Sequence, residues 1–464
     1  MTTTPVTWKS IATVNDPTNE AGDQTEARIT ELRDGRILVS WRDTGDNYDS
    51  LLGGDFVGQL YEVDGTPIGQ PFVLNTIWHG GPNTGSGTGT EYGHDIAATP
   101  DGGWFVVYED NNGNSNFIRG ERFDSDGNLI GQYTIASGSI SGDDAVYNPS
   151  IEVASNGDWV VTFARQDGNG METKGVVFDN NTFHTEDDFG SRSEGTAGGP
   201  VQVNNDTAIL SNGNIVTLNE DYASVSVATR INVQVTEPDG TVVRSFLAQT
   251  SVNNWNWENP RVEALEGGGF VVTYRAVNNG ADDYGIRAAV YNNAGQTVIS
   301  PFYVAFDNNS SSSSLRYSAS DVTPLDGGGF LIGWVEGGSL HFQRYDSAGV
   351  TVGNELIVSG AQPGFGSGDR FESFDMTRTQ DGRIMVAWTD PSQSGGDPVE
   401  FMILDVRNDG ITVTGTSQAD GLTTPNGGGT VNAGGGADTV VGRGGDDTFI
   451  DTDLTSGDHY NGRL

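Results

Sequence analysis

The segment "ATPDGGWFVVY", residues 98–108, holds the pattern that decides the fold. A tight turn containing glycine is followed by a short apolar strand that closes on an aromatic residue. The same pattern recurs as "ELRDGRILVSW" at residues 31–41, "VASNGDWVVTF" at residues 153–163 and "ALEGGGFVVTY" at residues 264–274. Apolar residues with period 2 on both sides of a turn predict a β-hairpin at each copy.

Seven copies run along the chain, each marked by a turn glycine. The spacings between these glycines are 67, 55, 56, 55, 60 and 54 residues, and the glycines are Gly35, Gly102, Gly157, Gly213, Gly268, Gly328 and Gly382. A third strand, another turn such as "FDSDGNLIG" and a fourth strand follow most copies, and no stretch has the period of a helix. Seven consecutive units of four short strands predict an all-β fold, the seven-bladed β-propeller.

The two ends of the repeat array complement each other. The seventh unit has three strands and ends at "VEFMILDVR", whereas "VTWKSIATVN" near the N-terminus resembles the fourth strand of the other units. We expect the N-terminal strand to close blade 7, so that residues 1–410 form the propeller without open edges. The aromatic residues that end the second strands are expected to fill the core between blades: Trp41, Tyr108, Phe163, Tyr274, Trp334 and Trp388, with Asn219 departing in blade 4.

The composition of the chain excludes some classes of binding partner. The 464 residues include 23 Lys and Arg against 63 Asp and Glu, a formal net charge of −40. Such a charge repels nucleic-acid phosphates and anionic lipids, so we expect no nucleic-acid partner. The chain has no cysteine, and no segment approaches the roughly 20 apolar residues of a membrane span. A monomer without membrane insertion is expected.

From about Thr412 a nine-residue period replaces the propeller pattern. Asp420, Gly429, Asp438 and Asp447 are nine apart, as are Leu422, Val431, Val440 and Phe449, and the best copies read "AGGGADTVV" and "GRGGDDTFI". Here the chain resembles the RTX nonapeptide-repeat family, with the pattern G-G-x-G-x-D-x-U-x. Ala433 and Arg443 stand where the pattern has glycine, and Gly429 where it has aspartate.

The RTX resemblance implies a short, truncated parallel β-roll over residues 411–464. It further implies Ca²⁺ bound near Asp420 and Asp438, and less completely near Asp447, because Ca²⁺ favours cages made of oxygen ligands. RTX proteins are typically exported by a one-step type I system that reads a C-terminal signal. The resemblance therefore implies a secreted, extracellular protein. A disordered Gly/Asp tail is the alternative interpretation of these residues.

The candidate catalytic residues come from an insertion, "WHGGPNTGSGTGTEYGH" at residues 78–94, which enters blade 2 and accounts for the long first spacing. It carries His79, Tyr92 and His94, and we expect it at the mouth of the axial funnel together with Arg165. Further substrate-binding candidates on the same face are Arg42, Tyr147, Asn148, Trp255, Trp257, Arg275, Tyr317 and Arg370.

A funnel with His, Tyr, Trp and Arg suits recognition of an anionic polysaccharide, because aromatic faces stack on sugar rings and guanidinium groups bind carboxylates. Architecture and residue types resemble propeller-type polysaccharide lyases, which cleave uronic-acid polymers by β-elimination. In that hypothesis His94 or His79 is the base and Tyr92 the acid, while Arg165, with Arg42 or Arg275, neutralises the substrate carboxylate.

Two alternatives stay open. The arginines Arg42, Arg165 and Arg275 have acidic neighbours in sequence and could form ion pairs between blades, and the histidines could be bonded within their loop. At the level of the whole chain, a non-catalytic glycan-binding propeller of an RTX adhesin would present a similar surface. The net charge of −40 favours this adhesin, because it repels an anionic polymer at low ionic strength.

Overall fold

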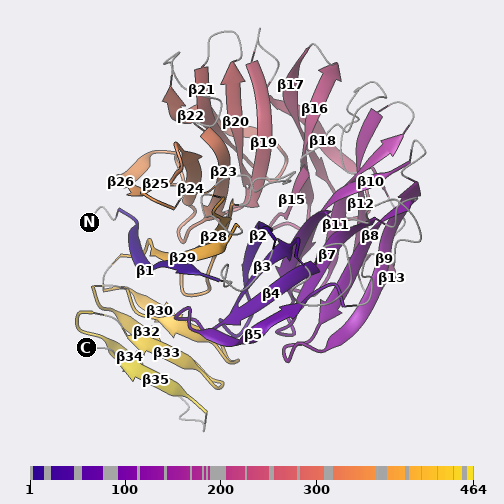
Figure 1. Ribbon diagram of the computed structural model, residues 1–464. Coiled ribbons are helices and arrows are strands. Elements are labelled where there is room, and N and C mark those ends of the chain that lie inside the picture. The colour runs from indigo at the N-terminus through magenta and orange to yellow at the C-terminus, as the bar shows by residue number, and fades with distance from the viewer. Residues whose placement is uncertain are drawn as a thin grey trace.

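The chain forms a ring of antiparallel sheets with a smaller pair of sheets beside it (Figure 1). The computed structural model describes residues 4–14, 22–45, 55–76, 92–111, 115–139, 144–167, 170–179, 182–183, 187–188, 205–224, 227–249, 255–278, 283–307, 317–361, 363, 374–391, 397–408, 410–425, 427–442, 444–451 and 457–462. Among these residues no helix occurs, and hence none that could cross a membrane.

Seven sheets make up the ring, so the predicted seven-bladed propeller is confirmed. Blades 1 to 3 consist of the following strands: β2 (Gln24–Glu31), β3 (Ile37–Asp43), β4 (Asp55–Tyr61) and β5 (Pro67–Val73); β6 (Tyr92–Ala98), β7 (Trp104–Asn111), β8 (Ser115–Phe123) and β9 (Leu129–Ser139); β10 (Val146–Val153), β11 (Trp159–Asp167), β12 (Gly170–Asp179), β13 (Thr182–Phe183) and β14 (Asp187–Asp188). In blade 3 the fourth strand is replaced by the two short strands β13 and β14, both paired with β12.

Blades 4 to 6 each have four consecutive strands. They are β15 (Asn205–Ile209), β16 (Ile215–Ser224), β17 (Val227–Thr236) and β18 (Val242–Gln249); β19 (Trp255–Ala264), β20 (Phe270–Asn278), β21 (Asp283–Tyr291) and β22 (Thr297–Asp307); β23 (Tyr317–Pro324), β24 (Phe330–Glu336), β25 (Ser339–Tyr345) and β26 (Thr351–Val358). In every blade the first strand lies innermost, next to the axis of the ring.

Blade 7 combines the two ends of the propeller sequence. It contains β27 (Phe374–Arg378), β28 (Ile384–Thr389), β29 (Val399–Asp405) and, as its outermost strand, β1 (Val6–Thr13), which pairs antiparallel with β29. Trp8 of β1 lies in a core shared with β3 and β29. This pairing leaves no gap between the first and last blades.

The turn glycines and the aromatic residues take the places that their spacing predicts. All seven turn glycines have positive φ, between +81° and +92°, which an L side chain rarely adopts. The six aromatic residues that end the second strands are at most 3% exposed, and Asn219 is equally buried in blade 4. The repeat therefore sets both the hairpins and the core between blades.

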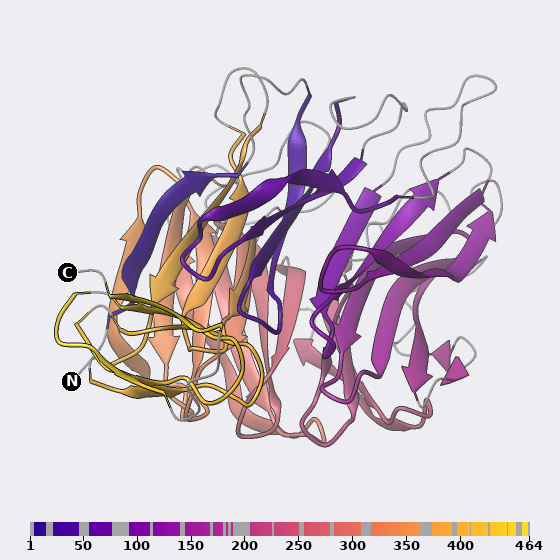
Figure 2. The ribbon, with the colours of Figure 1, turned by 90° about the horizontal axis from the view of Figure 1, so that it is seen from below.

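Two three-stranded parallel sheets follow the propeller (Figure 2). One contains β30 (Thr412–Thr414), β32 (Thr430–Asn432) and β34 (Thr448–Ile450), and the other β31 (Gly421–Thr423), β33 (Thr439–Gly442) and β35 (His459–Gly462). Successive strands alternate between the sheets, so strands of one sheet are mostly 18 residues apart. The expected apolar positions pack between them, with Leu422, Val431 and Val440 buried and Phe449 half-buried.

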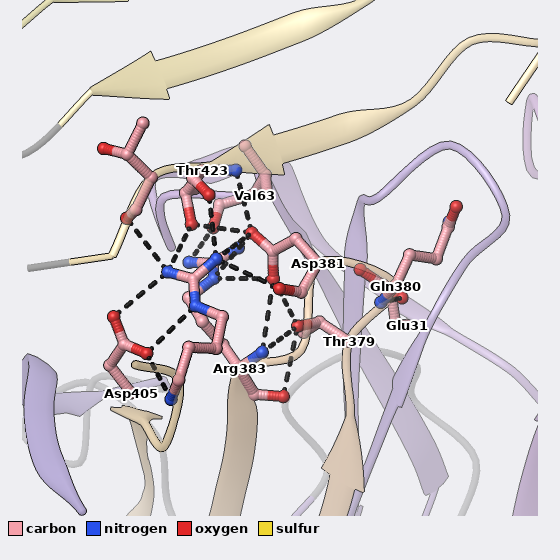
Figure 3. Close-up of polar contacts among 10 residues, drawn as sticks. Glu31, Val63, Thr379, Gln380, Asp381, Arg383, Asp405 and Thr423 are labelled. Carbon is pink, nitrogen blue, oxygen red and sulfur yellow. Dashed lines mark hydrogen bonds and ion pairs between the residues drawn. The ribbon is translucent and has the colours of Figure 1, made fainter. Parts of the chain in front are cut away.

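A buried polar network joins these sheets to the propeller (Figure 3). The Asp381 carboxylate, in the turn after β27, accepts hydrogen bonds from the Thr423 backbone N–H at 2.8 Å and the Thr423 hydroxyl at 2.6 Å. Arg383 Nε contacts both Asp381 oxygens at 3.0 Å, and Arg407 donates to the Thr423 and Thr424 carbonyl oxygens. Gly35 and Gly421 approach backbone to backbone at the same contact. The C-terminal sheets are thus fixed against blades 7 and 1.

Candidate functional site

A polar cavity of about 310 Å³ lies on the axis of the ring. Residues from the innermost strands of all seven blades line it, so it is the axial channel of the propeller. Two arginines, Arg28 of β2 and Arg261 of β19, face six acidic residues there: Asp95, Glu152, Asp206, Glu263, Asp321 and Asp375. Its volume is at the lower end of the range for ligand sites.

Four of these carboxylates join neighbouring blades. Each lies on an innermost strand and accepts a hydrogen bond from a backbone N–H of the next blade's innermost strand. The pairs are Asp95 with Ile151 at 2.9 Å, Asp206 with Val262 at 2.7 Å, Asp321 with Met376 at 2.7 Å and Asp375 with Ile29 at 2.8 Å. The channel acids are therefore partly structural.

The same acids have unusual proton affinities. Burial raises the pKa of Asp95 to about 6, and burial together with the Asp375 carboxylate raises the pKa of Asp321 to about 8. Removal from bulk water and the neighbouring carboxylates also raise the pKa values of Glu152 and Glu263 well above their ordinary range. Groups of this kind hold protons near neutral pH and can act as general acids.

Glu152 and Glu263 differ from the four aspartates in their surroundings. Both are half-buried in the cavity wall, on β10 and β19, two residues beyond the position of the inter-blade carboxylates. The Glu152 carboxylate contributes to the raised pKa of Glu263. The pKa values of both groups are therefore raised, mainly by burial.

The innermost strands contain strained β-bulges in their first halves. Glu26, Asn148 and Asn259 have φ values of 56°, 53° and 49°, and Gly93 takes the same conformation in blade 2. The Glu26 carboxylate accepts a hydrogen bond from the Gly93 N–H at 2.9 Å. Left-handed residues other than glycine cost energy and often mark functional regions. Asn148, a predicted substrate-binding residue, lines the cavity from this position.

His94 lies between blades 1 and 2 and is only 1% exposed. Its Nε2 is 2.8 Å from the Ser40 hydroxyl, its Nδ1 is 3.9 Å from Glu26, and its ring packs on Phe56 at 4.6 Å. Burial lowers its pKa to about 4, so the imidazole is neutral at physiological pH. This enclosed position gives the predicted role of general base no support.

The predicted arginines lie next to acids or inside the core. Arg165 contacts Asp144 at 3.0 Å, and Arg275 contacts Glu258 at 2.8 Å. Arg42 is 6% exposed beside Glu26. Arg165 and Arg275 thus form ion pairs, as the alternative interpretation expects, and neither presents an uncompensated charge to a substrate.

The predicted aromatic residues divide into two groups. Trp257 is a core residue at 2% exposure, whereas Trp255 is half-buried and stacks on it with a centroid distance of 5.5 Å. Tyr147 is half-buried at the start of β10. His79 and Arg370 lie outside the described residues, and Tyr92 and Tyr317 are described only as members of strands β6 and β23.

The predicted metal ligands stack in consecutive turns of the C-terminal sheets. Asp438 accepts a hydrogen bond from the Asp420 N–H at 3.0 Å, and Asp447 accepts one from the Gly429 N–H at 3.3 Å. A Cβ at Gly434 would clash with the Thr416 carbonyl oxygen, so the turns pack backbone against backbone. These oxygen donors suit Ca²⁺ in kind. Within the described residues, no three acidic or histidine side chains converge as a metal site.

The channel acids and arginines were not predicted from the sequence, although a regular spacing marks all of them except Glu152 and Glu263. Arg28, Asp95, Ser150, Asp206, Arg261, Asp321 and Asp375 each precede the turn glycine of their repeat by seven residues. A position that is charged in six of seven repeats is unusual inside a propeller. Aligning the repeats on their glycines would have found it.

Comparisons with known proteins identify the architecture. No protein-family model and no curated protein matches the chain. Among solved structures, it is similar to the polysaccharide lyase Uly1, with a TM-score of 0.50 and 8% identity over 85% of this chain and 91% of that one. It is also similar to the α-L-arabinofuranosidase Arb93A from Fusarium graminearum, with a TM-score of 0.46 and 11% identity over 87% and 97%.

A protein of unknown function from Dyadobacter fermentans has a TM-score of 0.48 and 11% identity, over 87% of this chain and 99% of that one. At such low identities these likenesses concern the fold alone.

Proposed function

We propose that the protein acts on carbohydrate, and specifically that it is a lyase cleaving a uronic-acid polysaccharide by β-elimination. The observation that carries the proposal is the axial cavity, where arginines lie beside carboxylic acids that retain protons near neutral pH. The choice of a lyase is supported by the likeness in fold to Uly1, which is named a polysaccharide lyase.

The reaction needs three groups. A cation neutralises the sugar carboxylate, a base removes the proton from the adjacent carbon, and an acid protonates the departing glycosidic oxygen. In the cavity, Arg28 or Arg261 would bind the carboxylate, and Glu152 and Glu263 would divide the roles of base and acid between them. His79 and Tyr92 remain the candidates at the funnel mouth.

The size of the cavity favours a single sugar unit. At about 310 Å³ it lies at the small end of ligand pockets, so a long segment of polymer would have to bind elsewhere on the surface. A glycosidase acting on a neutral sugar would also use paired carboxylates, but it has no need of the two arginines. The arginines therefore favour an acidic sugar, and elimination is the reaction that uses the neutralised carboxylate directly.

The experiment is incubation with alginate, polygalacturonate and hyaluronan while recording the ultraviolet absorbance of the C4=C5 double bond that elimination creates. The wild type should generate this absorbance on one of them. Glu152→Gln and Glu263→Gln should each lose about 10²–10⁴ in rate, as for a positioned acid or base. Thr377→Val, at the equivalent position of blade 7, is the control for altering the cavity wall without removing an acid.

Calcium and location belong to the same proposal. Asp420, Asp438 and Asp447, with turn carbonyl oxygens, would hold Ca²⁺, which would stabilise the C-terminal sheets. An extracellular location, expected from the resemblance of these repeats to exported RTX proteins, fits a polysaccharide substrate. An adhesin that binds glycans without cleaving them is the alternative, and would give retention on a polysaccharide without new absorbance.

A further inference from the structure

A continuous set of aromatic rings leads from the core of blade 5 to its surface. Tyr274 and Trp257 are buried and meet edge to face at 5.8 Å. Trp257 stacks on Trp255 with an interplanar angle of 7°, and Trp255 lies 6.5 Å from Phe306 on the outermost strand. The inner rings hold the outer ones in place, so the outer rings form a preorganised surface.

The outer end of this set is exposed. Phe306 and Tyr303 are 44% and 42% exposed, and their rings are 4.6 Å apart on β22. Gly285 on the neighbouring strand β21 makes room for them, because a Cβ there would lie 3.3 Å from both rings. Isolated exposed apolar side chains are ordinary, whereas adjoining exposed rings on one face commonly mark a binding site.

A cation, the Arg287 guanidinium, contacts two rings of this set. The Arg287 guanidinium is 4.7 Å from the Tyr303 ring and 5.6 Å from the Trp257 ring. Its side chain is half-buried and donates to the Gln249 side-chain oxygen and the Pro301 carbonyl oxygen, both neutral acceptors. No carboxylate among the described residues pairs with it. At the equivalent position of blade 6, His341 pairs with Glu355.

Within the described part of the blade, the Arg287 guanidinium is thus bonded to neutral acceptors only, although the Asp283 carboxylate also acts on the Tyr303 ring. The chain as a whole has a net charge of −40, yet the two acceptors to which this arginine donates are neutral. Aromatic faces bind the apolar faces of sugar rings, and a guanidinium group binds a carboxylate or sulfate with charge-assisted hydrogen bonds. An acidic sugar combines an apolar ring face and an anionic group in one unit, whereas an apolar protein surface has no anion to pair with the guanidinium.

We propose that Trp255, Tyr303, Phe306 and Arg287 form a binding platform for an acidic pyranose unit of a polysaccharide. The platform residues come from β19, β21 and the outermost strand β22 of blade 5, and none of them lines the axial cavity. The choice of ligand class rests on the proposed function, and the aromatic surface and its cation are independent of it. The platform would hold a length of polymer that the small cavity cannot accommodate.

Affinity electrophoresis through gels containing alginate, polygalacturonate or hyaluronan tests the platform, with dextran as the uncharged probe. The wild type should be retarded by at least one acidic polymer and less by dextran. Tyr303→Ala combined with Phe306→Ala should weaken that affinity about tenfold, since each ring contributes a stacking contact. Ile357→Ala, the equivalent exposed position on β26 at 53% exposure, is the matched control and should bind as the wild type does.

Arg287→Gln tests the charge separately. It should reduce retardation by the acidic polymer and make the remaining retardation less sensitive to salt, because screening weakens only the ionic part. The proposal is overturned if no acidic polymer retards the wild type, if the double aromatic variant binds equally well, or if dextran retards the wild type as strongly. Retardation without elimination in the absorbance assay would sink the lyase proposal and leave the platform standing.

Discussion

Replacing Asp381 by alanine should separate the C-terminal sheets from the propeller and destabilise both. The side chain is fully buried and bonds to Arg383 and Thr423, and its carboxylate lies 3.5 Å from Arg407. Burial opposes its ionisation, yet the two guanidinium groups hold the pKa of Asp381 well below its usual range. Removing one member of a buried ion network leaves uncompensated charges, which costs about 3–5 kcal/mol.

Urea unfolding followed by tryptophan fluorescence measures this loss, because Trp8 lies under the Arg383 guanidinium at 4.3 Å. Asp326→Ala is the matched control: Asp326 also pairs with an arginine, Arg378, but its side chain is 64% exposed. An exposed pair contributes about 0–1 kcal/mol. Equal losses in the two variants would refute the argument that the buried network joins the sheets to the propeller.

The contact between the two parts can be isolated further with Thr423→Val, which removes the hydroxyl that donates to Asp381 at 2.6 Å. A double-mutant cycle with Asp381→Ala should give a coupling of at least about 0.5 kcal/mol, as for residues in direct contact. Additive losses would show that Thr423 and Asp381 act independently.

Three further predictions concern protons and calcium. Burial and the Asp375 carboxylate raise the pKa of Asp321 to about 8, so the folded chain binds more protons than the unfolded chain between about pH 4 and 8. The free energy of unfolding therefore falls as the pH rises through this range. From pH 6 to pH 8 the wild type should lose about 2 kcal/mol more than Asp321→Asn in urea melts. His94 should remain neutral at pH 5 in NMR spectra, since burial lowers its pKa to about 4, and titration near pH 6.5 would contradict its enclosed position. Ca²⁺ should bind in equilibrium dialysis and slow proteolysis of residues 411–464, and Asp438→Ala should weaken both effects; identical protection with chelator would argue against a calcium site.

The fold was predictable because the sequence of each repeat determines its own turn and strands. The turn before Trp104 needs a left-handed residue, and Gly102 provides it, while alternating apolar residues on either side form the two strands. The missing fourth strand of blade 7 likewise indicated where β1 would pair. These are local or counting arguments that require no knowledge of side-chain contacts.

The site was harder to predict because its residues meet only in three dimensions. His94 follows a Gly-rich insertion and has the residue type of a base, yet its place on the buried side of β6 packs it on Phe56. Glu152 and Glu263 belong to blades 3 and 5, and only closure of the ring brings them to one cavity. The contact between Asp381 and Thr423 joins the propeller repeats to the nine-residue repeats, so neither repeat pattern indicates it.

The most direct test of the central claim is mass spectrometry of the products formed from a uronic-acid polysaccharide in water labelled with heavy oxygen. Elimination adds no water, so the account predicts unsaturated oligosaccharides free of label, absent when Glu152 and Glu263 are both changed to glutamine. Saturated products carrying the label would mean hydrolysis and would contradict the lyase mechanism. Unchanged polymer from alginate, polygalacturonate and hyaluronan alike would contradict a lyase acting on these uronic-acid polymers.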